Sequence, residues 1–481
     1  KHLKPYFTDD KIYSTPHHEC HASASYYVSP FKEASFLTID GFGTDGNLTY
    51  GVAKDNHLKF LFKNWDLDES ALGDRWMYTN HLFGETGFLN SGVGSSGVEG
   101  TVMAAAGLGE HNKKAVKELE EVFYKGFIFK EPVYTRHNKN KKCKTFLEKT
   151  YYSYLKKFKE PKNKDQTPLF IEYCTAIQSA TERALKYWVG KIYETTKIKN
   201  FCLNGGVMLN SVAVGKLYEE YPDFRFWVGP SVNDGAQAIG AAFHTWYHKL
   251  NNSRKVSSIA ESAQLGPKYS SSEVLRAIHE LTRAERENSF ISYAKVSYKD
   301  LVKYIEQAPV MVWQGRSPIG RRALGNRSIL ADPRNPNVKS YINQEIKYRK
   351  NYRPYAPAVL SEYVNDLFLI DKPSPYMELT LPYRPEIQQK YPAIWHHTGR
   401  GRPQTVDINT YPEFHALLLE WYSLTGAPVL LNTSFNIHEP IVESPQDAIR
   451  TWQRSKLAYL YLDGYLLQAE MVEHVVDTLD D

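Results

Sequence analysis

The amino-acid sequence predicts an α/β protein with two domains. Residues 200–217 and 226–248 each contain an apolar strand, a turn with glycine and then a helix rich in small residues. This alternation is typical of an α/β layer. The character of the sequence changes near residue 266, so we expect one domain over 1–265 and a second over 266–481. A chain of 481 residues is long enough to give each domain its own hydrophobic core.

The composition excludes several classes of protein. Charged residues make up 23% and hydrophobic residues 42% of the chain, which is typical of a folded protein and not of a disordered one. The net charge of +5 can favour anionic substrates but is too small to indicate nucleic acid as a partner. No apolar stretch is long enough to span a bilayer, so we expect no membrane partner. The 4 cysteines form no CxxC pair, and we expect a cytoplasmic protein with reduced thiols.

The first domain is expected to begin with a short helix over residues 17–30. Residues 33–53 are apolar and β-branched around a glycine-rich turn, which predicts a hairpin with Asp40 at the end of its first strand. The small residues of 97–110 predict a tightly packed helix or a backbone close to a ligand. Apolar residues at helical spacing predict a long helix over 168–196.

Residues 136–165 carry many lysines interleaved with tyrosines. One interpretation is a patch that binds RNA or phosphate. We favour the other, a solvated connecting segment with an amphipathic helix, because runs of charge usually face solvent.

The segment that begins at residue 17 contains a candidate metal site. His17 and His21 are four residues apart, so on a helix they share one face and could hold one ion. They could equally be ordinary polar residues near a helix end. Asp40 at a strand end and Asp234 at a helix start favour the metal, because α/β folds gather ligands at the carboxyl ends of strands. Two imidazoles with two carboxylates suit iron, zinc or manganese. Cys20 is expected to pack inward.

Two glycine turns are candidate phosphate sites. Gly205 and Gly206 follow an apolar strand and precede a helix, so their N–H groups could approach an anion that the helix dipole favours. Gly41 and Gly43 form a second turn after a strand. Each pattern alone is weak, since glycines also make plain turns.

The densest signal lies in the second domain, within residues 313–334. Its arginines sit among glycines and apolar residues, and they are Arg316, Arg321, Arg322, Arg327 and Arg334. Further basic residues follow at Lys347, Arg349, Arg353, Arg400 and Arg402. Few acidic residues are near them in the sequence, so we favour guanidinium groups that bind phosphate or carboxylate over arginines in structural ion pairs.

Seven segments, taken in order, carry a resemblance to a known family. They are "HHECHASASYY", "LTIDGFG", "NGGVMLNSVAVGKL", "GRRALGNRSILADPR", "YRPYAPAVL", "RPQTV" and "PVLLNTSFN". From about His17 to Leu467 the chain resembles the NodU/CmcH family of O-carbamoyltransferases, which includes the tobramycin carbamoyltransferase. Any one segment could occur by chance, whereas all seven in this order are specific.

The resemblance implies a fold and an activity. The first domain would be actin-like, related to sugar kinases and to the tRNA threonylcarbamoyl-transfer enzyme TsaD, and the second would be YrdC-like. The second domain would form carbamoyl-adenylate from carbamoyl phosphate and ATP, with Mg²⁺ accompanying the ATP. The first would pass the carbamoyl group to a hydroxyl of a small-molecule acceptor and release AMP.

The resemblance also implies roles for particular residues. The family's metal ligands match His17, His21, Asp40 and Asp234, which would hold iron, with zinc or manganese as alternatives. The basic cluster around carbamoyl phosphate and the ATP phosphates matches Arg322, Lys347, Arg353 and Arg402. Nucleotide contacts would come from Gly41, Gly43, Gly205, Gly206, Asn210, Asn326 and Arg327.

The sequence departs from the family pattern in several places. The family's opening lobe, with a histidine that is the candidate base for the acceptor hydroxyl, has no counterpart, so we expect it to be trimmed or supplied by a separate subunit. Thr101 replaces a lysine, Pro318 replaces a glutamate, and Arg321 replaces a proline. Two alternatives therefore stay open. One is a tRNA-modifying carbamoyl or threonylcarbamoyl enzyme, and the other is a non-catalytic subunit that binds nucleotide.

Overall fold

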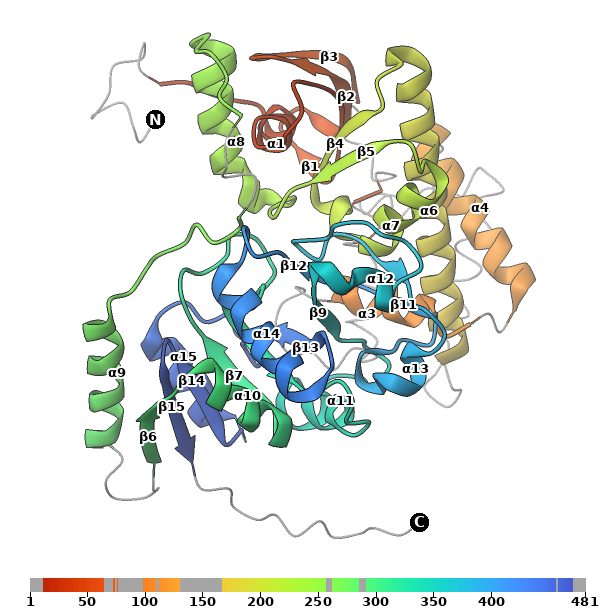
Figure 1. Cartoon of the computed structure of the whole chain (residues 1–481). Helices are drawn as coiled ribbons and strands as arrows, with labels where there is room; N and C mark the ends of the chain where they lie inside the picture. The colour runs from red at the N-terminus through yellow and green to blue at the C-terminus, as the bar shows by residue number, and fades with distance from the viewer. Residues whose placement is uncertain are drawn as a thin grey trace, which may run out of the picture. The chain divides into compact units, whose positions relative to one another are not determined.

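The structure, a computed structural model, divides the chain into two compact units (Figure 1). The first comprises 1–261 with 378–380, and the second comprises 262–377 with 381–481. The residues whose structure is described are 12–64, 72–73, 76, 98–109, 112–129, 167–256, 262–284, 291–455 and 457–469. The lysine- and tyrosine-rich segment 136–165 lies outside them. The assignment of the two units as actin-like and YrdC-like stays a prediction.

The helices and strands of the first unit follow the predicted order closely. Its elements are α1 (His17–Tyr26), β1 (Glu33–Gly43), β2 (Gly46–Lys54), β3 (His57–Asn64), α3 (Val98–Ala106), α4 (Lys113–Phe129), α6 (Thr167–Thr196), β4 (Asn200–Asn204), η2 (Gly206–Leu209), α7 (Ser211–Glu220), β5 (Arg225–Val228), η3 (Asp234–Ala236), α8 (Gln237–Phe243) and the π-helix η4 (His244–Lys249). The predicted first helix, hairpin, small-residue helix and long helix are confirmed as α1, β1–β2, α3 and α6. The strand β3 extends the hairpin by one strand that the sequence did not predict.

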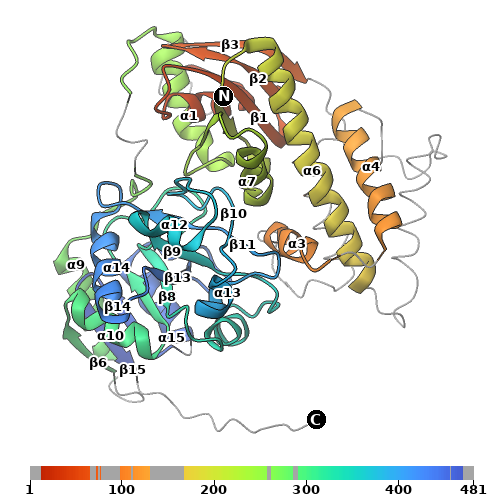
Figure 2. The ribbon, with the colours of Figure 1, turned by 45° about the vertical axis from the view of Figure 1, so that its right-hand side comes forward.

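The sheet of the first unit has the order β3-β2-β1-β4-β5. β1 pairs antiparallel with β2 and parallel with β4, and β5 pairs parallel with β4. Alternate side chains of β1 face opposite layers. Ser35 bonds to Thr196 of α6, whereas Phe36 packs with Ala22 and Tyr26 of α1. Helices therefore cover both faces, and Figure 2 shows α1 and α6 on opposite sides of the sheet.

Helix α1 is buried along most of its length, which its small side chains allow. It packs against β1, β4 and α8. The contact with α8 is a close one, because a Cβ at Gly240 would lie 2.0 Å from the carbonyl oxygen of Cys20. Just beyond the helix, the guanidinium of Arg254 donates to the carbonyls of Tyr26 and Ser29 and so satisfies acceptors at the helix end. These contacts fix the position of α1 over the sheet.

The second unit contains a larger mixed sheet. Its elements are α9 (Ser271–Ala284), β6 (Ile291–Lys295), α10 (Tyr298–Gln307), β7 (Val310–Trp313), β8 (Arg327–Ala331), α11 (Val338–Tyr341), the π-helix η6 (Ile342–Ile346), β9 (Ala356–Leu360), η7 (Ser361–Tyr363), α12 (Val364–Leu367), β10 (Leu381–Pro382), α13 (Ile387–Lys390), η8 (Pro392–Ile394), β11 (Arg400–Gly401), β12 (Gln404–Val406), α14 (Pro412–Thr425), β13 (Val429–Ser434), α15 (Pro445–Arg454), β14 (Tyr459–Leu462) and β15 (Tyr465–Ala469). The strand order is β12-β9-β13-β8-β7-β14-β15-β6. Trp313, Trp421 and Trp452 are buried in its core. In the described part of the chain, no helix combines the length and apolar character that crossing a bilayer requires.

Candidate functional site

Strand β1 presents an aspartate to helix α1. Residues 36, 38 and 40 alternate onto the same face, where the hydroxyl of Thr38 lies 2.7 Å from Nδ1 of His18. Regular pairing with β2 reaches Ile39 and resumes only at Gly43, because the register shifts between them. Asp40 therefore lies at the break in the ladder and is free to turn toward the N-terminal turns of α1. The hairpin turn itself is at residues 44–45, a little later than the sequence predicts.

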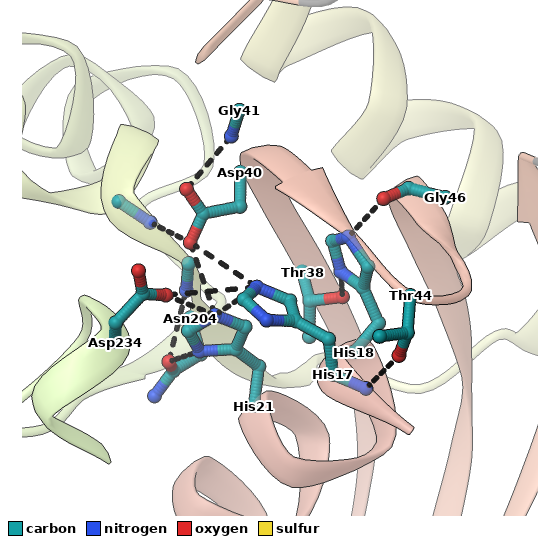
Figure 3. Close-up of polar contacts among 12 residues, drawn as sticks. His17, His18, His21, Thr38, Asp40, Gly41, Thr44, Gly46, Asn204 and Asp234 are labelled. Carbon is teal, nitrogen blue, oxygen red and sulfur yellow. Dashed lines mark hydrogen bonds and ion pairs between the residues drawn. The ribbon is translucent and has the colours of Figure 1, made fainter. Parts of the chain in front are cut away.

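Four side chains from three parts of the first unit meet here, as predicted: His17, His21, Asp40 and Asp234 (Figure 3). One potential ligand atom of each lies within 4.8 Å of the others. Nε2 of His21 is 3.1 Å from Nε2 of His17 and 3.0 Å from Oδ2 of Asp40. Oδ1 of Asp234 is 3.6 Å from Nε2 of His17 and 3.7 Å from Nε2 of His21. One side of the site is buried and the other faces solvent, since His21 is fully buried and the Asp234 side chain is 73% exposed.

This donor set fits one divalent cation. Ligand atoms roughly 2.0–2.2 Å from an ion such as zinc are separated from one another by roughly 3–3.6 Å. The two contacts of His21 Nε2 with His17 and Asp40 lie in this range at 3.1 and 3.0 Å, whereas the distance from Nε2 of His17 to Oδ2 of Asp40 is 3.8 Å, so some atoms must move closer to bind one ion. Two carboxylates would balance the charge of a divalent ion, and imidazole with carboxylate suits iron, zinc and manganese. The exposed side at Asp234 leaves access for a further oxygen ligand.

The surroundings of Asp40 favour its ionised form. Burial opposes ionisation of Asp40, but the contacts with His17 and His21 and the N–H of Gly206 outweigh it, so the pKa of Asp40 lies well below its usual range. The nearby Asp40 carboxylate raises the pKa of His17, against the opposing effect of burial. The Asp40 carboxyl group is therefore held in its charged form, which is the form that binds a cation.

The glycine turn after β4 lies against this cluster. Gly205 has a φ of 95°, and its N–H donates to the carbonyl of Val232. The N–H of Gly206 donates to Oδ2 of Asp40 over 2.9 Å, and the N–H of Gly41 donates to Oδ1 of the same carboxylate over 2.7 Å. Asn210 caps α7 by accepting from the N–H of Ala213. The glycines predicted to contact nucleotide thus lie next to the candidate ligands, and their nucleotide role stays a prediction.

Three further residues near the cluster have structural contacts. His18 is fully buried, with Nδ1 against Thr38 and Nε2 against the carbonyl of Gly46. Burial lowers the pKa of His18 to about 3, so this imidazole is neutral. Cys20 is 4% exposed, which confirms that it packs inward. Gly43 lies against the His17 ring, because a Cβ there would be 2.7 Å from Cδ2 of that ring.

The second unit brings three of the predicted arginines together. Arg322, Arg353 and Arg402 are partly buried and influence one another electrostatically. Burial and the charge of Arg349 lower the pKa of Arg353 to about 9, and burial and the charge of Arg321 lower that of Arg322 to about 10. Burial also lowers the pKa of Arg402 well below its usual range. A guanidinium still keeps its charge at neutral pH, so a bound anion would offset this repulsion.

These three arginines differ from the paired arginines of the same unit. Arg334 forms ion pairs with Asp332 and Glu306. Within the residues that the structure describes, no ion pair involves Arg322, Arg353 or Arg402. Guanidinium groups without an ion-pair partner suit an anionic ligand, and the oxyanion site stays a prediction.

Three other predicted residues have contacts within their own unit. Nζ of Lys347 lies 2.7 Å from the carbonyl of Asn436 and 2.8 Å from its side-chain oxygen. Arg327 is fully buried, donates to the carbonyl of Gln314 and stacks on Trp313. These contacts all lie within the second unit.

Asn326 is likewise engaged within the second unit. It is 3% exposed, and its side chain donates to the carbonyl of Arg316 and accepts from Gln264. The predicted ligand roles of Lys347, Arg327 and Asn326 stay predictions.

The sequence interpretation missed Asn204, the last residue of β4. Its Oδ1 is 2.7 Å from Nδ1 of His21 (Figure 3). The position of Asn204 directly before the Gly205–Gly206 turn was the available signal. Nothing local connects it to a histidine 183 residues earlier.

Comparison with known proteins matches two family models to separate parts of the chain. The family model described as Carbamoyltransferase N-terminus matches residues 2–243, and the model described as Carbamoyltransferase C-terminus matches residues 302–469. An uncharacterized protein of Synechocystis is 33% identical over 94% of this chain and 75% of its own length. The nodulation protein NolNO of Sinorhizobium fredii is 30% identical over 95% of this chain and 64% of its own length. Nodulation protein U of Rhizobium tropici is 27% identical over 96% of this chain and 77% of its own length.

The family is therefore established by matches to both halves of the chain. The chain belongs to the carbamoyltransferase family of enzymes.

Proposed function

We propose that the chain is an ATP-dependent O-carbamoyltransferase that works through carbamoyl-adenylate. The observation that carries this proposal is the group of Arg322, Arg353 and Arg402, whose charges are partly buried and repel one another. Such a group is stabilised by a ligand with several negative oxygens, and carbamoyl phosphate and the ATP phosphates both have them. The carbamoyltransferase family makes the carbamoyl group the fragment to be transferred.

The proposed reaction has three steps. Water converts carbamoyl phosphate to carbamate and inorganic phosphate. An oxygen of carbamate then forms a bond to the α-phosphorus of ATP as pyrophosphate leaves, which gives carbamoyl-adenylate. Finally the hydroxyl oxygen of a small-molecule acceptor bonds to the carbamoyl carbon, AMP leaves, and the hydroxyl proton is lost. The arginines would hold the anionic groups and stabilise the charge that develops on them.

In the first unit, His17, His21, Asp40 and Asp234 would hold a divalent ion, with iron as the first choice and zinc or manganese as alternatives. When bound, such an ion supplies positive charge to a phosphate or leaving oxygen. The N–H groups of Gly41 and Gly206 would keep the Asp40 carboxylate oriented. A Mg²⁺ ion would accompany the ATP phosphates.

The test is release of pyrophosphate from ATP by the purified chain, with and without carbamoyl phosphate. Release should depend on carbamoyl phosphate and should be lost in Arg353→Ala. The matched control is Arg334→Ala, which removes an arginine of the same unit that is already paired with Asp332 and Glu306. This control should keep release. Absence of release from folded, metal-loaded wild-type protein would refute the adenylate-forming step, and equal loss in both variants would refute the role of the arginine group.

A further inference from the structure

The carboxamide of Asn204 has a defined orientation. The residue is 1% exposed and ends β4. Its Oδ1 lies 2.9 Å from the backbone nitrogen of Gly205 and 2.7 Å from Nδ1 of His21. The Gly205 N–H is shared between this oxygen and the carbonyl of Val232. A backbone N–H can only donate, and an NH₂ group 2.9 Å away would place two donors against each other, so the side-chain atom that faces Gly205 is assigned as the oxygen. This orientation leaves Nδ2 of Asn204 buried without a hydrogen-bond partner among the described residues.

The orientation of Asn204 determines which nitrogen of His21 carries a proton. Because the same oxygen faces Nδ1 of His21, that nitrogen must donate and therefore carries the hydrogen. In a neutral imidazole the other nitrogen, Nε2, is then left with its lone pair. Nε2 is the atom that faces His17, Asp40 and Asp234. The opposite tautomer would place a proton among the candidate ligand atoms.

We propose that Asn204 is a positioning residue of the metal centre, which holds His21 in the tautomer and orientation that present Nε2 to the ion. This inference rests on the proposed metal-binding role of the four side chains. A hydrogen-bond acceptor behind a ligating histidine typically changes metal affinity by roughly 10–100-fold when it is removed. Asn204 also accepts from the Gly205 N–H, so the glycine turn and the imidazole share one acceptor.

The test compares three variants with the wild-type protein. Asn204→Leu keeps a similar shape but removes the acceptor, whereas Asn204→Asp keeps an oxygen in its place. Thr38→Val is the matched control, because Thr38 is fully buried and makes the corresponding contact with Nδ1 of His18, a histidine outside the ligand set. The readouts are the dissociation constants for Zn²⁺ and Mn²⁺, measured against a chromophoric chelator, and the visible absorption spectrum of the Co²⁺-loaded protein.

We expect Asn204→Leu to bind both ions roughly 10–100-fold more weakly and to give an altered Co²⁺ spectrum. Asn204→Asp should bind both ions with an affinity within about threefold of the wild type. Thr38→Val should also have an affinity within about threefold of the wild type, even where its stability is lower. Should Asn204→Leu fail to fold, the proposal still predicts that Asn204→Asp and Thr38→Val retain affinity while Asn204→Ala loses it.

The outcomes separate this inference from the proposed metal centre. Wild-type protein that binds no divalent ion would refute both. Wild-type protein that binds an ion, together with Asn204→Leu of equal affinity or Asn204→Asp as weak as Asn204→Leu, would refute the positioning role alone. Loss of affinity in Thr38→Val equal to that in Asn204→Leu would also overturn it, because the effect would then follow from general destabilisation of α1.

Discussion

The backbone N–H of Gly206 donates a hydrogen bond to Oδ2 of Asp40 over 2.9 Å, across 166 residues of chain. This contact joins the turn after β4 to the carboxylate at the break in β1. The carboxylate thus takes its position from the neighbouring parallel strand as well as from its own. A substitution in the turn should therefore change the metal affinity of the site without replacing any candidate ligand.

Gly206→Ala tests this connection. The added Cβ would lie 3.0 Å from Oδ1 of Asp40, so the carboxylate must move by a few tenths of an ångström. We expect metal affinity to fall by roughly tenfold, which corresponds to about 1.4 kcal/mol. The control is Gly229→Ala, whose Cβ would be 3.6 Å from Nε1 of Trp227, an ordinary contact. Chelator competition measures both, and equal affinities in the two variants would contradict the prediction.

The neighbouring histidines of α1 should respond in opposite ways to the same substitution. His21→Gln removes a candidate ligand, so we expect the bound metal, measured by elemental analysis, to fall nearly to zero. His18→Gln removes contacts with Thr38 and Gly46 and should keep the metal. It should lower the free energy of unfolding by about 1–3 kcal/mol, because buried partners lose their hydrogen bonds. Retention of metal by His21→Gln would contradict the assignment of the ligands.

Substitution in the arginine group should weaken substrate binding without lowering the stability of the protein. Arg402→Gln relieves repulsion with Arg322 and Arg353, so its melting temperature without ligand should equal or exceed that of the wild type. Its KM for carbamoyl phosphate should rise roughly 10–100-fold, as expected for loss of a charge-assisted hydrogen bond.

Arg334→Gln is the matched control for that variant. It breaks pairs with Asp332 and Glu306 and should therefore melt earlier with an unchanged KM. Thermal melting and steady-state kinetics of both variants give the comparison. A lower melting temperature in Arg402→Gln would show that its charge stabilises the ligand-free unit.

Two cysteines should be protected in the folded protein. Burial raises the pKa of Cys202 to about 12 and that of Cys174 well above its usual range. The reactive thiolate is therefore scarce at pH 8, and both side chains are fully buried. We expect neither to react with iodoacetamide at pH 8 until denaturant is added, as peptide mass spectrometry can show. Rapid labelling of either residue in native protein would contradict their burial.

Several elements could be predicted because their signals are local. The spacing of apolar residues predicted α6, and an apolar, β-branched run around a glycine-rich turn predicted β1 and β2. Strand β3 was missed although exposed residues alternate with buried or partly buried ones over its first half, which is the pattern of a half-buried strand. The four candidate metal ligands were predicted from donor type, local position and family resemblance together, and the structure brings them close to one another.

The arginine-rich segment contains two arginines whose different contacts could not be predicted from the sequence. Arg322 and Arg327 are five residues apart in the same motif and are both basic. In the structure, Arg322 joins a repelling cationic group, whereas Arg327 donates to carbonyls and stacks on Trp313. Their difference depends on which strand or loop faces each side chain, and sequence spacing carries no information about that.

The sequence by itself determined the types of donor and their local placement, with His17 and His21 one helical turn apart and Asp40 after an apolar strand. Only the tertiary structure decided that Asp234 reaches the same point and that Asn204 holds His21 in one tautomer. The physical reason is that a hydrogen bond or a ligand set requires atoms within about 3–4 Å. Between distant parts of the chain, such proximity arises from the packing of α1 on the sheet and from the order of its strands.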